Sequence, residues 1–315
     1  MSGGVTGGDG AVIAYLGPAG TFAESAARQL TPEDRHVPAH SVIAALDMVR
    51  HGDVDAAVVP IENSVEGSVS GTLDELSAAP ALRITAETAV PVRFTLMAPE
   101  APADLRDIAA VGTHPHASAQ CRRWIYENLP DATVVPTSST AAAAEALAGG
   151  TAEFSAAIGN ALAAERFGLV ALADDIADNR EAVTRFVRIE RPGTLTGPTG
   201  CDKTSLMLFM KSNRSGALLE ILTEFAVRGI NMTRLESRPT RHALGEYCFS
   251  VDIEGHVAEA RIGEALLGLH RICADVVFLG SYPRLDGVES VVPEGLTDRD
   301  YASAHEWLDD LRAGG

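Results

Sequence analysis

Hydrophobic and polar positions in the first half of the chain form blocks that predict strands followed by helices. An apolar run over residues 11–16 ends in Gly17-Pro18, and a helical pattern follows over 22–30. Residues 41–50 predict a second helix and 55–60 a buried strand. This order is typical of a parallel sheet with helices on its faces, so we expect an α/β fold.

The same rhythm continues to about residue 190. The further elements that we expect are strands over 94–97, 108–112, 156–158, 170–173 and 184–190, and helices over 115–128, 140–148 and 161–167.

The pattern changes after a stretch over 192–202 that is rich in proline and glycine and that we interpret as a linker. The expected elements beyond it are strands over 204–211, 230–238, 246–253 and 276–282, and helices over 216–227 and 258–269. This βαββαβ order is the ferredoxin-like plan. The acidic tail from residue 284 holds one more predicted helix, over 301–311.

Composition narrows the class of protein. The chain has 315 residues, of which 46% are hydrophobic and 22% charged, which is enough to bury the cores of about two domains. Its net charge of −18 opposes binding to nucleic acid and to acidic membrane surfaces. No apolar run is long enough for a transmembrane helix, and the first ten residues do not resemble a secretory signal. We therefore expect a cytoplasmic protein. The four scattered cysteines form no zinc-binding pair.

Four polar loops at predicted strand ends are candidates for binding an anion. In the first, Thr21 and Glu24 have the spacing of a capping box after two glycines, and free N–H groups at a helix start favour an anion. A capped turn without a ligand would have the same sequence. In the second, Glu62, Asn63 and Ser64 follow a buried strand, where ligands of open α/β sheets bind. They could equally satisfy only their own loop.

The third and fourth loops carry cationic or potentially cationic groups. His114 and His116 flank Pro115, which suits the first turn of a helix. Such histidines can donate to an anion or can be simple caps. In Thr184-Arg185-Phe186, the arginine beside a hydroxyl and a ring is a candidate carboxylate clamp, or else part of a structural ion pair. Together the four loops predict a pocket for a small anion with more than one acidic group.

These motifs together resemble the prephenate dehydratase family. The matching stretches are 15–22 (YLGPAGTF), 59–72 (VPIENSVEGSVSGT), 113–121 (THPHASAQC) and 184–186 (TRF). In the second region, Gly216-Ala217-Leu218 and Glu236-Ser237-Arg238-Pro239 resemble the GAL and ESRP motifs of the family's regulatory ACT domain. The chain departs from the family pattern at Ala23, where serine is usual, at Thr113 and His116 of the third loop, and at Ala182.

The resemblance implies a domain organisation. The catalytic region would span residues 1–191 and consist of two α/β lobes, as in type II periplasmic binding proteins, over about 11–90 plus 172–190 and about 91–171. The ACT domain would span 203–284, and 285–315 would form an acidic tail. No metal and no organic cofactor are expected, and homodimers or homotetramers are usual in the family.

The implied activity is the decarboxylative dehydration of prephenate to phenylpyruvate in phenylalanine biosynthesis. Thr184 would donate a hydrogen bond to the leaving hydroxyl. A threonine hydroxyl is a poor acid, so the proton itself would come through water, His114 or Glu62. The residues expected to bind substrate are Thr21, Asn63, Ser64, Arg185, Phe186 and His116.

L-Phenylalanine is the expected effector and inhibitor. The resemblance places it at Gly216, Ala217, Leu218 and the ESRP motif, Glu236, Ser237, Arg238 and Pro239. Two alternatives remain open from the sequence. Arogenate is a close alternative substrate, and a cleft coupled to an ACT domain could also serve a solute sensor without catalysis.

Overall fold

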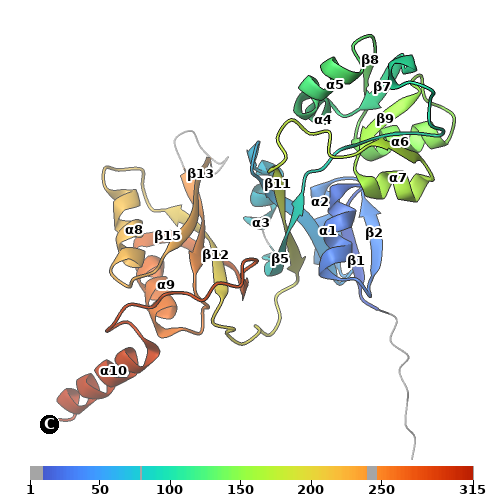
Figure 1. Cartoon of the computed structure of the whole chain (residues 1–315). Helices are drawn as coiled ribbons and strands as arrows, with labels where there is room; N and C mark the ends of the chain where they lie inside the picture. The colour runs from blue at the N-terminus through green and yellow to red at the C-terminus, as the bar shows by residue number, and fades with distance from the viewer. Residues whose placement is uncertain (1–9, 79, 240–246, 315) are drawn as a thin grey trace, which may run out of the picture. The chain divides into compact units, whose positions relative to one another are not determined.

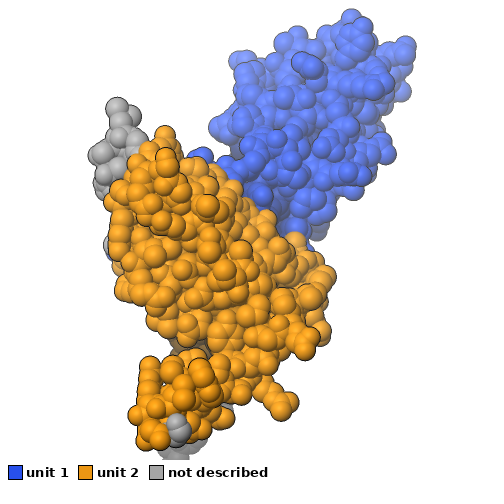
Figure 2. Space-filling model, turned by 90° about the vertical axis from the view of Figure 1, so that its left-hand side faces the viewer, with its two compact units in different colours: residues 1–72, 88–188 blue, residues 73–87, 189–315 orange. Residues whose placement is uncertain are grey.

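The computed structural model describes residues 10–78, 80–239 and 247–314. The chain divides into two compact units, residues 1–72 with 88–188 and residues 73–87 with 189–315 (Figure 1, Figure 2). It passes from one unit to the other inside α3 (Ser70–Leu76), inside β5 (Arg83–Pro91) and inside β11 (Val183–Glu190). The short segment 73–87 therefore packs with the C-terminal region, although the sequence places it in the first half.

The first sheet of unit 1 has the strand order β2-β1-β3-β11-β5, with the short strand β4 (Gly67–Ser68) paired to β3. Strand β1 (Val12–Leu16) pairs in parallel with β2 (Arg35–Ala39) and β3 (Ala56–Asn63). The first helices are α1 (Phe22–Leu30) and α2 (Val42–His51). Alanines of α1 and apolar residues of β1 and β3 form the core beneath that helix.

The second sheet of unit 1 has the order β10-β6-β9-β7-β8. Its strands are β6 (Thr95–Ala98), β7 (Ala110–Thr113), β8 (Thr133–Pro136), β9 (Ala156–Gly159) and β10 (Val170–Ala173). Its helices are η1 (Leu105–Asp107), α4 (Pro115–Gln120), α5 (Arg122–Asn128), α6 (Thr140–Ala148) and α7 (Ala161–Phe167). Strand β6 runs antiparallel to β9 and β10, so this sheet is mixed rather than wholly parallel. Two lobes, each built on one sheet, confirm the predicted α/β fold class.

Unit 2 contains an antiparallel sheet of order β13-β14-β12-β15. Its elements are β12 (Asp202–Met210), α8 (Ala217–Ala226), β13 (Met232–Pro239), β14 (Tyr247–Glu254), α9 (Ala260–Ile272), β15 (Cys273–Pro283) and α10 (Asp298–Arg312). Helices α8 and α9 cover one face of the sheet through an apolar core (Figure 1). The predicted βαββαβ order is confirmed, with the exception that Glu246, the first residue of the predicted third strand, lies outside the described residues.

Several local predictions were wrong or incomplete. The helix expected over 115–128 is interrupted at Cys121, because the Asp178 carboxylate accepts from the N–H groups of Arg123 and Trp124 and so starts a new helix. Strands β2, β5 and β8 and helix α3 were not predicted. Within the described ranges, no helix is long and apolar enough to cross a membrane.

Candidate active site and effector site

A cavity of about 530 Å³ in unit 1 is lined by residues from both lobes. Its lining residues are Leu16, Gly17, Pro18, Thr21, Phe22, Ala23, His40, Pro60, Asn63, Val92, Phe94, His114, His116, Ala117, Gln120, Ser138, Ser139, Thr140, Thr184 and Phe186. All four predicted polar loops contribute to the lining: the first through Thr21, the second through Asn63, the third through both histidines and the fourth through Thr184 and Phe186. The loops that we predicted separately thus meet at one place.

Helix starts supply much of the polar lining. Thr21 caps α1 and accepts from the Glu24 N–H, and Ser139 caps α6 and accepts from the Ala142 N–H. His114 caps the short helix α4. No arginine or lysine is among the described residues that line this cavity. An anion bound here would therefore be held by N–H groups, hydroxyls and imidazoles rather than by a permanently charged side chain.

Asn63 and Thr184 form a hydrogen-bonded pair in the cavity wall. The Asn63 Oδ1 accepts from the N–H groups of Val65 and Glu66 at 2.8 and 3.0 Å, which leaves its amide Nδ2 as the donor. That Nδ2 donates to Thr184 Oγ1 at 2.8 Å. Because the Thr184 oxygen accepts this bond, its own O–H remains available as a donor toward a ligand. Phe186, which is 2% exposed, lies on the same face of β11, two residues further on.

Three of the residues expected at the active site do not line the cavity: Glu62, Ser64 and Arg185. Side chains alternate along a strand, so Arg185 points to the opposite face from Thr184 and Phe186. There its Nη1 lies 3.6 Å from the Glu62 carboxylate. The Ser64 hydroxyl accepts from the Val183 N–H at 2.9 Å, which fastens the loop to β11.

This geometry changes what we expect of Arg185. Replacing it with lysine should leave kcat/KM within about threefold of the original, because lysine keeps the positive charge beside Glu62 and no substrate contact is lost. Steady-state kinetics with prephenate would measure the effect. A large rise in KM with unchanged kcat would instead support the carboxylate clamp that the sequence suggested.

His114 and His116 lie edge to face, with 5.0 Å between their ring centroids. Burial, and then the neighbouring His116, lower the pKa of His114, while Glu66 opposes the shift. Its Nδ1 accepts from the His116 N–H, so the neutral ring carries its proton on Nε2 and is a donor. His116 is more exposed, and its Nδ1 lies 3.0 Å from the Glu66 carboxylate.

Sequence reasoning missed several lining residues. His40 follows β2, a strand that the pattern did not reveal, and directly precedes the Ser41 cap of α2. Phe22 and Phe94 meet edge to face at 5.7 Å and form an apolar wall. Ser138 belongs to a hydroxyl-rich loop before α6. The sequence shows that loop as a run of serines and threonines placed before a helix, as the His114 loop is, but Ser138 was not among the residues that we expected to bind substrate.

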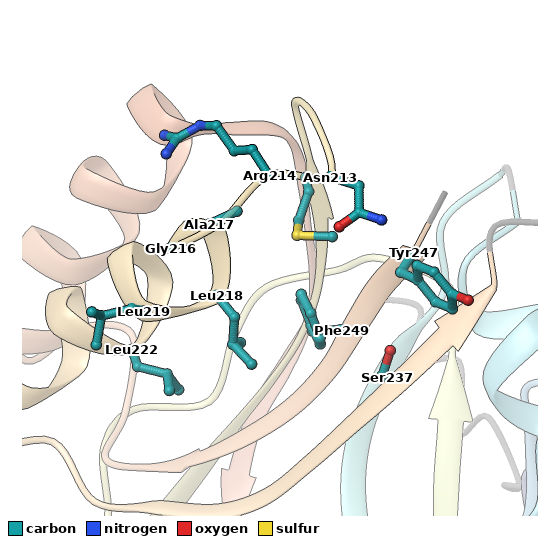
Figure 3. A pocket seen from close by; sticks show the side chains of 11 residues that line it. Asn213, Arg214, Gly216, Ala217, Leu218, Leu219, Leu222, Ser237, Tyr247 and Phe249 are labelled. Atoms are coloured by element: carbon teal, nitrogen blue, oxygen red, sulfur yellow. The ribbon is translucent and has the colours of Figure 1, made fainter. Parts of the chain in front are cut away.

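A second cavity, of about 540 Å³, lies in unit 2 between the start of α8 and the sheet (Figure 3). Its lining residues are Met210, Asn213, Arg214, Gly216, Ala217, Leu218, Leu219, Leu222, Ser237, Tyr247 and Phe249. Leu218 and Phe249 point toward each other from α8 and β14. Four of the residues predicted to bind an effector are therefore together, namely the GAL motif and Ser237.

Glu236 and Arg238 of the ESRP motif point away from this cavity, because side chains alternate along β13 and both are neighbours of Ser237. Pro239, at the end of the strand, is on the Ser237 face. Glu236, Arg238 and Pro239 are not among its lining residues. Arg238 donates to the Asp74 carboxylate of α3 at 2.6 Å and to Glu236 at 3.0 Å. On this face Arg238 is buried, with 8% exposure.

Comparisons with known proteins agree with this architecture. The family model described as prephenate dehydratase matches residues 13–194, and the ACT domain model matches 204–271. The chain is 47% identical to a prephenate dehydratase of Amycolatopsis methanolica, with 96% of this chain and 98% of that protein covered.

Two solved structures are also similar. One, a prephenate dehydratase of Arthrobacter aurescens in complex with L-Phe, has a TM-score of 0.90 and 47% identity, and the match covers 96% of this chain and 99% of that one. The other, GqqA, is described as a novel type of quorum quenching acylase and has a TM-score of 0.78 and 32% identity, with 86% and 97% covered. The match to the family model over most of unit 1, and the identity to relatives along nearly the whole chain, show that this chain belongs to the prephenate dehydratase family.

Proposed function

We propose that the chain converts prephenate to phenylpyruvate, carbon dioxide and water. The observation that carries this proposal is the Thr184 hydroxyl, oriented by Asn63 in a cavity whose polar lining comes largely from helix starts. Prephenate carries two carboxylates and a ring hydroxyl. The cavity offers donors for each of these groups.

The reaction needs little chemical assistance beyond orientation. The bond from the ring to its carboxylate breaks, the electron pair enters the ring, and the hydroxyl opposite leaves with one proton as water. Thr184 donates a hydrogen bond to that hydroxyl as negative charge develops on it. The proton comes through water or from the Nε2–H of His114, since the Glu62 carboxyl does not line the cavity.

The apolar part of the lining suits the substrate ring and the departing carbon dioxide. Phe22, Phe94 and Phe186 all contribute to the wall. The first N–H groups of α1 and α6 face the carboxylates in this proposal, where helix dipoles favour negative charge.

An assay with purified protein tests the proposal. Mixing it with prephenate should give phenylpyruvate, whereas binding without turnover would favour the solute sensor. Arogenate run in parallel distinguishes the two substrates, because it would give phenylalanine instead. An amide-hydrolysis assay tests whether the chain also has acylase activity, the activity for which GqqA is named.

Turnover should survive exhaustive dialysis and a chelator. The elimination makes the ring aromatic and needs no electron sink, and the donors that we propose are Thr184 and the N–H groups at helix starts. We therefore expect the rate to stay within about twofold of the untreated protein. The measurement is the prephenate rate before and after treatment. A lost rate that returned only with an added metal would contradict this prediction.

We further infer that L-phenylalanine binds the cavity of unit 2 and inhibits turnover. Leu218, Phe249 and Met210 offer an apolar surface for a ring, while Asn213, Ser237 and the backbone at the start of α8 offer polar partners for an amino acid. The similar structure from Arthrobacter aurescens contains L-Phe, which supports the choice of effector.

The organisation that we propose keeps a catalytic region over 1–191, an ACT domain over 203–284 and a tail over 285–315. A homodimer or homotetramer and a cytoplasmic location remain predictions from the sequence and the family. So does a reaction without a cofactor.

A further inference from the structure

A buried carboxylate lies directly behind the wall of the unit 1 cavity. Glu24 is in the first turn of α1, one residue after the cavity-lining Ala23, and its side chain is only 3% exposed. Its Oε2 accepts from the Gly20 N–H at 2.6 Å. Its Oε1 accepts from Arg28 and from Arg166, each at 2.7 Å.

This arrangement differs from the capping box that the sequence predicts. In a capping box the carboxylate returns to the N–H of the cap residue, here Thr21. Glu24 bonds to Gly20 instead, while the Thr21 hydroxyl still accepts from the Glu24 N–H. Within the described part of the chain, the Thr21 N–H makes no hydrogen bond, so it can donate to a ligand.

The partners of Glu24 come from both lobes. Gly20 and Arg28 belong to the first lobe, whereas Arg166 is in α7 of the second lobe, 142 positions away in the sequence. Gly20 has a φ of +86°, and a Cβ there would lie 3.3 Å from the Ala163 Cα of α7. The loop before α1 is therefore packed tightly on α7 as well as bonded to Glu24.

Electrostatics keep this carboxylate ionised. Burial acts to raise the pKa of Glu24, but the Gly20 N–H and then the Arg28 and Arg166 guanidinium groups outweigh it and hold that pKa below its ordinary value. Burial, and then the Glu24 charge, raise the pKa of Tyr15 to about 12. A buried charge with several fixed donors orders the groups around it.

We propose that Glu24 is a positioning residue for the reaction, because it joins the loop before Thr21 to Arg166 of the second lobe. This inference rests on the proposed function. The cavity is lined by α1 on one side and by His114 and Ser139 of the second lobe on the other. The Glu24–Arg166 bond sets how closely these donors approach one substrate molecule. The spacing of these donors affects the bound substrate and the transition state equally. Loss of the Glu24–Arg166 bond should therefore raise mainly KM.

Two arginines on the same carboxylate allow a matched test in the full chain. Arg166→Met removes the bond between the lobes, and Arg28→Met removes the bond within α1, while both keep an apolar stem. We expect Arg166→Met to raise KM for prephenate by about tenfold or more with kcat within about threefold. Arg28→Met should change neither by more than about twofold, and Arg166→Lys should recover part of the loss. Glu24→Gln should resemble Arg166→Met.

Equal effects of Arg166→Met and Arg28→Met, or a lower melting temperature with unchanged KM, would overturn the proposal. Hydrogen exchange of the peptides over 16–24 and 160–168 supplies a readout that does not need turnover. Arg166→Met should speed exchange in both peptides, and Arg28→Met should leave 160–168 unchanged. If the unaltered protein does not turn over prephenate, the proposed function is wrong. Hydrogen exchange would still show whether the Glu24–Arg166 bond holds the two lobes together. Unchanged hydrogen exchange of both peptides in Arg166→Met would contradict the positioning role.

Discussion

Replacing Thr184 with alanine is expected to lower kcat for prephenate by on the order of 10²–10³, the usual loss for one well-placed donor to developing charge. KM should change by no more than about threefold, because the bond strengthens chiefly as the hydroxyl departs. The geometry leaves the Thr184 hydroxyl as a donor. Asn63 already donates to the Thr184 oxygen, so the hydroxyl proton is not used on Asn63 and can be donated to a ligand in the cavity that Thr184 lines.

Two variants at the same position separate the hydroxyl from the shape of the side chain. Thr184→Ser keeps the hydroxyl and should retain most of the rate, whereas Thr184→Val keeps the shape and should match alanine. Steady-state kinetics under saturating prephenate give the comparison. If valine raised only KM, Thr184 would be a binding residue, and the leaving hydroxyl would need another donor.

The sequence predicted the elements that have strong local patterns. Strand β1 and helix α1 were expected over 11–16 and 22–30 and occur at Val12–Leu16 and Phe22–Leu30. Strand β2, Arg35–Ala39, was missed because its charged residue, histidine and proline do not alternate with apolar ones. The break at Cys121 was also missed, since it depends on Asp178, which is distant in the sequence.

At the proposed active site, the sequence indicated which loops meet but not which side chains share a face. Thr184-Arg185-Phe186 reads as one motif, yet β11 sends its middle residue to the opposite side. The two-residue period of a strand predicts that these three side chains cannot all face one pocket. The Glu24–Arg166 bond had no comparable signal, because it depends on how two lobes pack.

The ESRP motif repeats this lesson in unit 2. Ser237 lines the cavity, whereas Arg238 bonds to Asp74 in α3. That helix begins in unit 1, where the Thr72 hydroxyl donates to the carbonyl of Pro60 at 2.5 Å. Pro60 lines the unit 1 cavity. The division between the two units falls inside this helix, with Thr72 in unit 1 and Asp74 in unit 2.

Replacing Ser237 with tryptophan is expected to abolish the response to phenylalanine. The indole would extend from β13 into the cavity lined by Leu218 and Phe249, so the ligand could not enter. Isothermal calorimetry on the full chain should show no heat of binding at millimolar phenylalanine. The rate with phenylalanine, divided by the rate of the same variant without it, should be close to one.

Arg238→Met is the informative contrast, because Arg238 is absent from the cavity lining but joins β13 to Asp74. A ligand inhibits only if it binds an inactive conformation more tightly than an active one. A substitution outside the effector cavity can therefore weaken inhibition while phenylalanine still binds. We expect this variant to bind phenylalanine with a Kd within about threefold of the original while its inhibition falls at least fivefold, at the lower end of typical coupling. Should Arg238→Met lose binding as completely as Ser237→Trp, the motif would act on the effector itself and α3 would not be the link. Full inhibition in Ser237→Trp would place the effector at some other site.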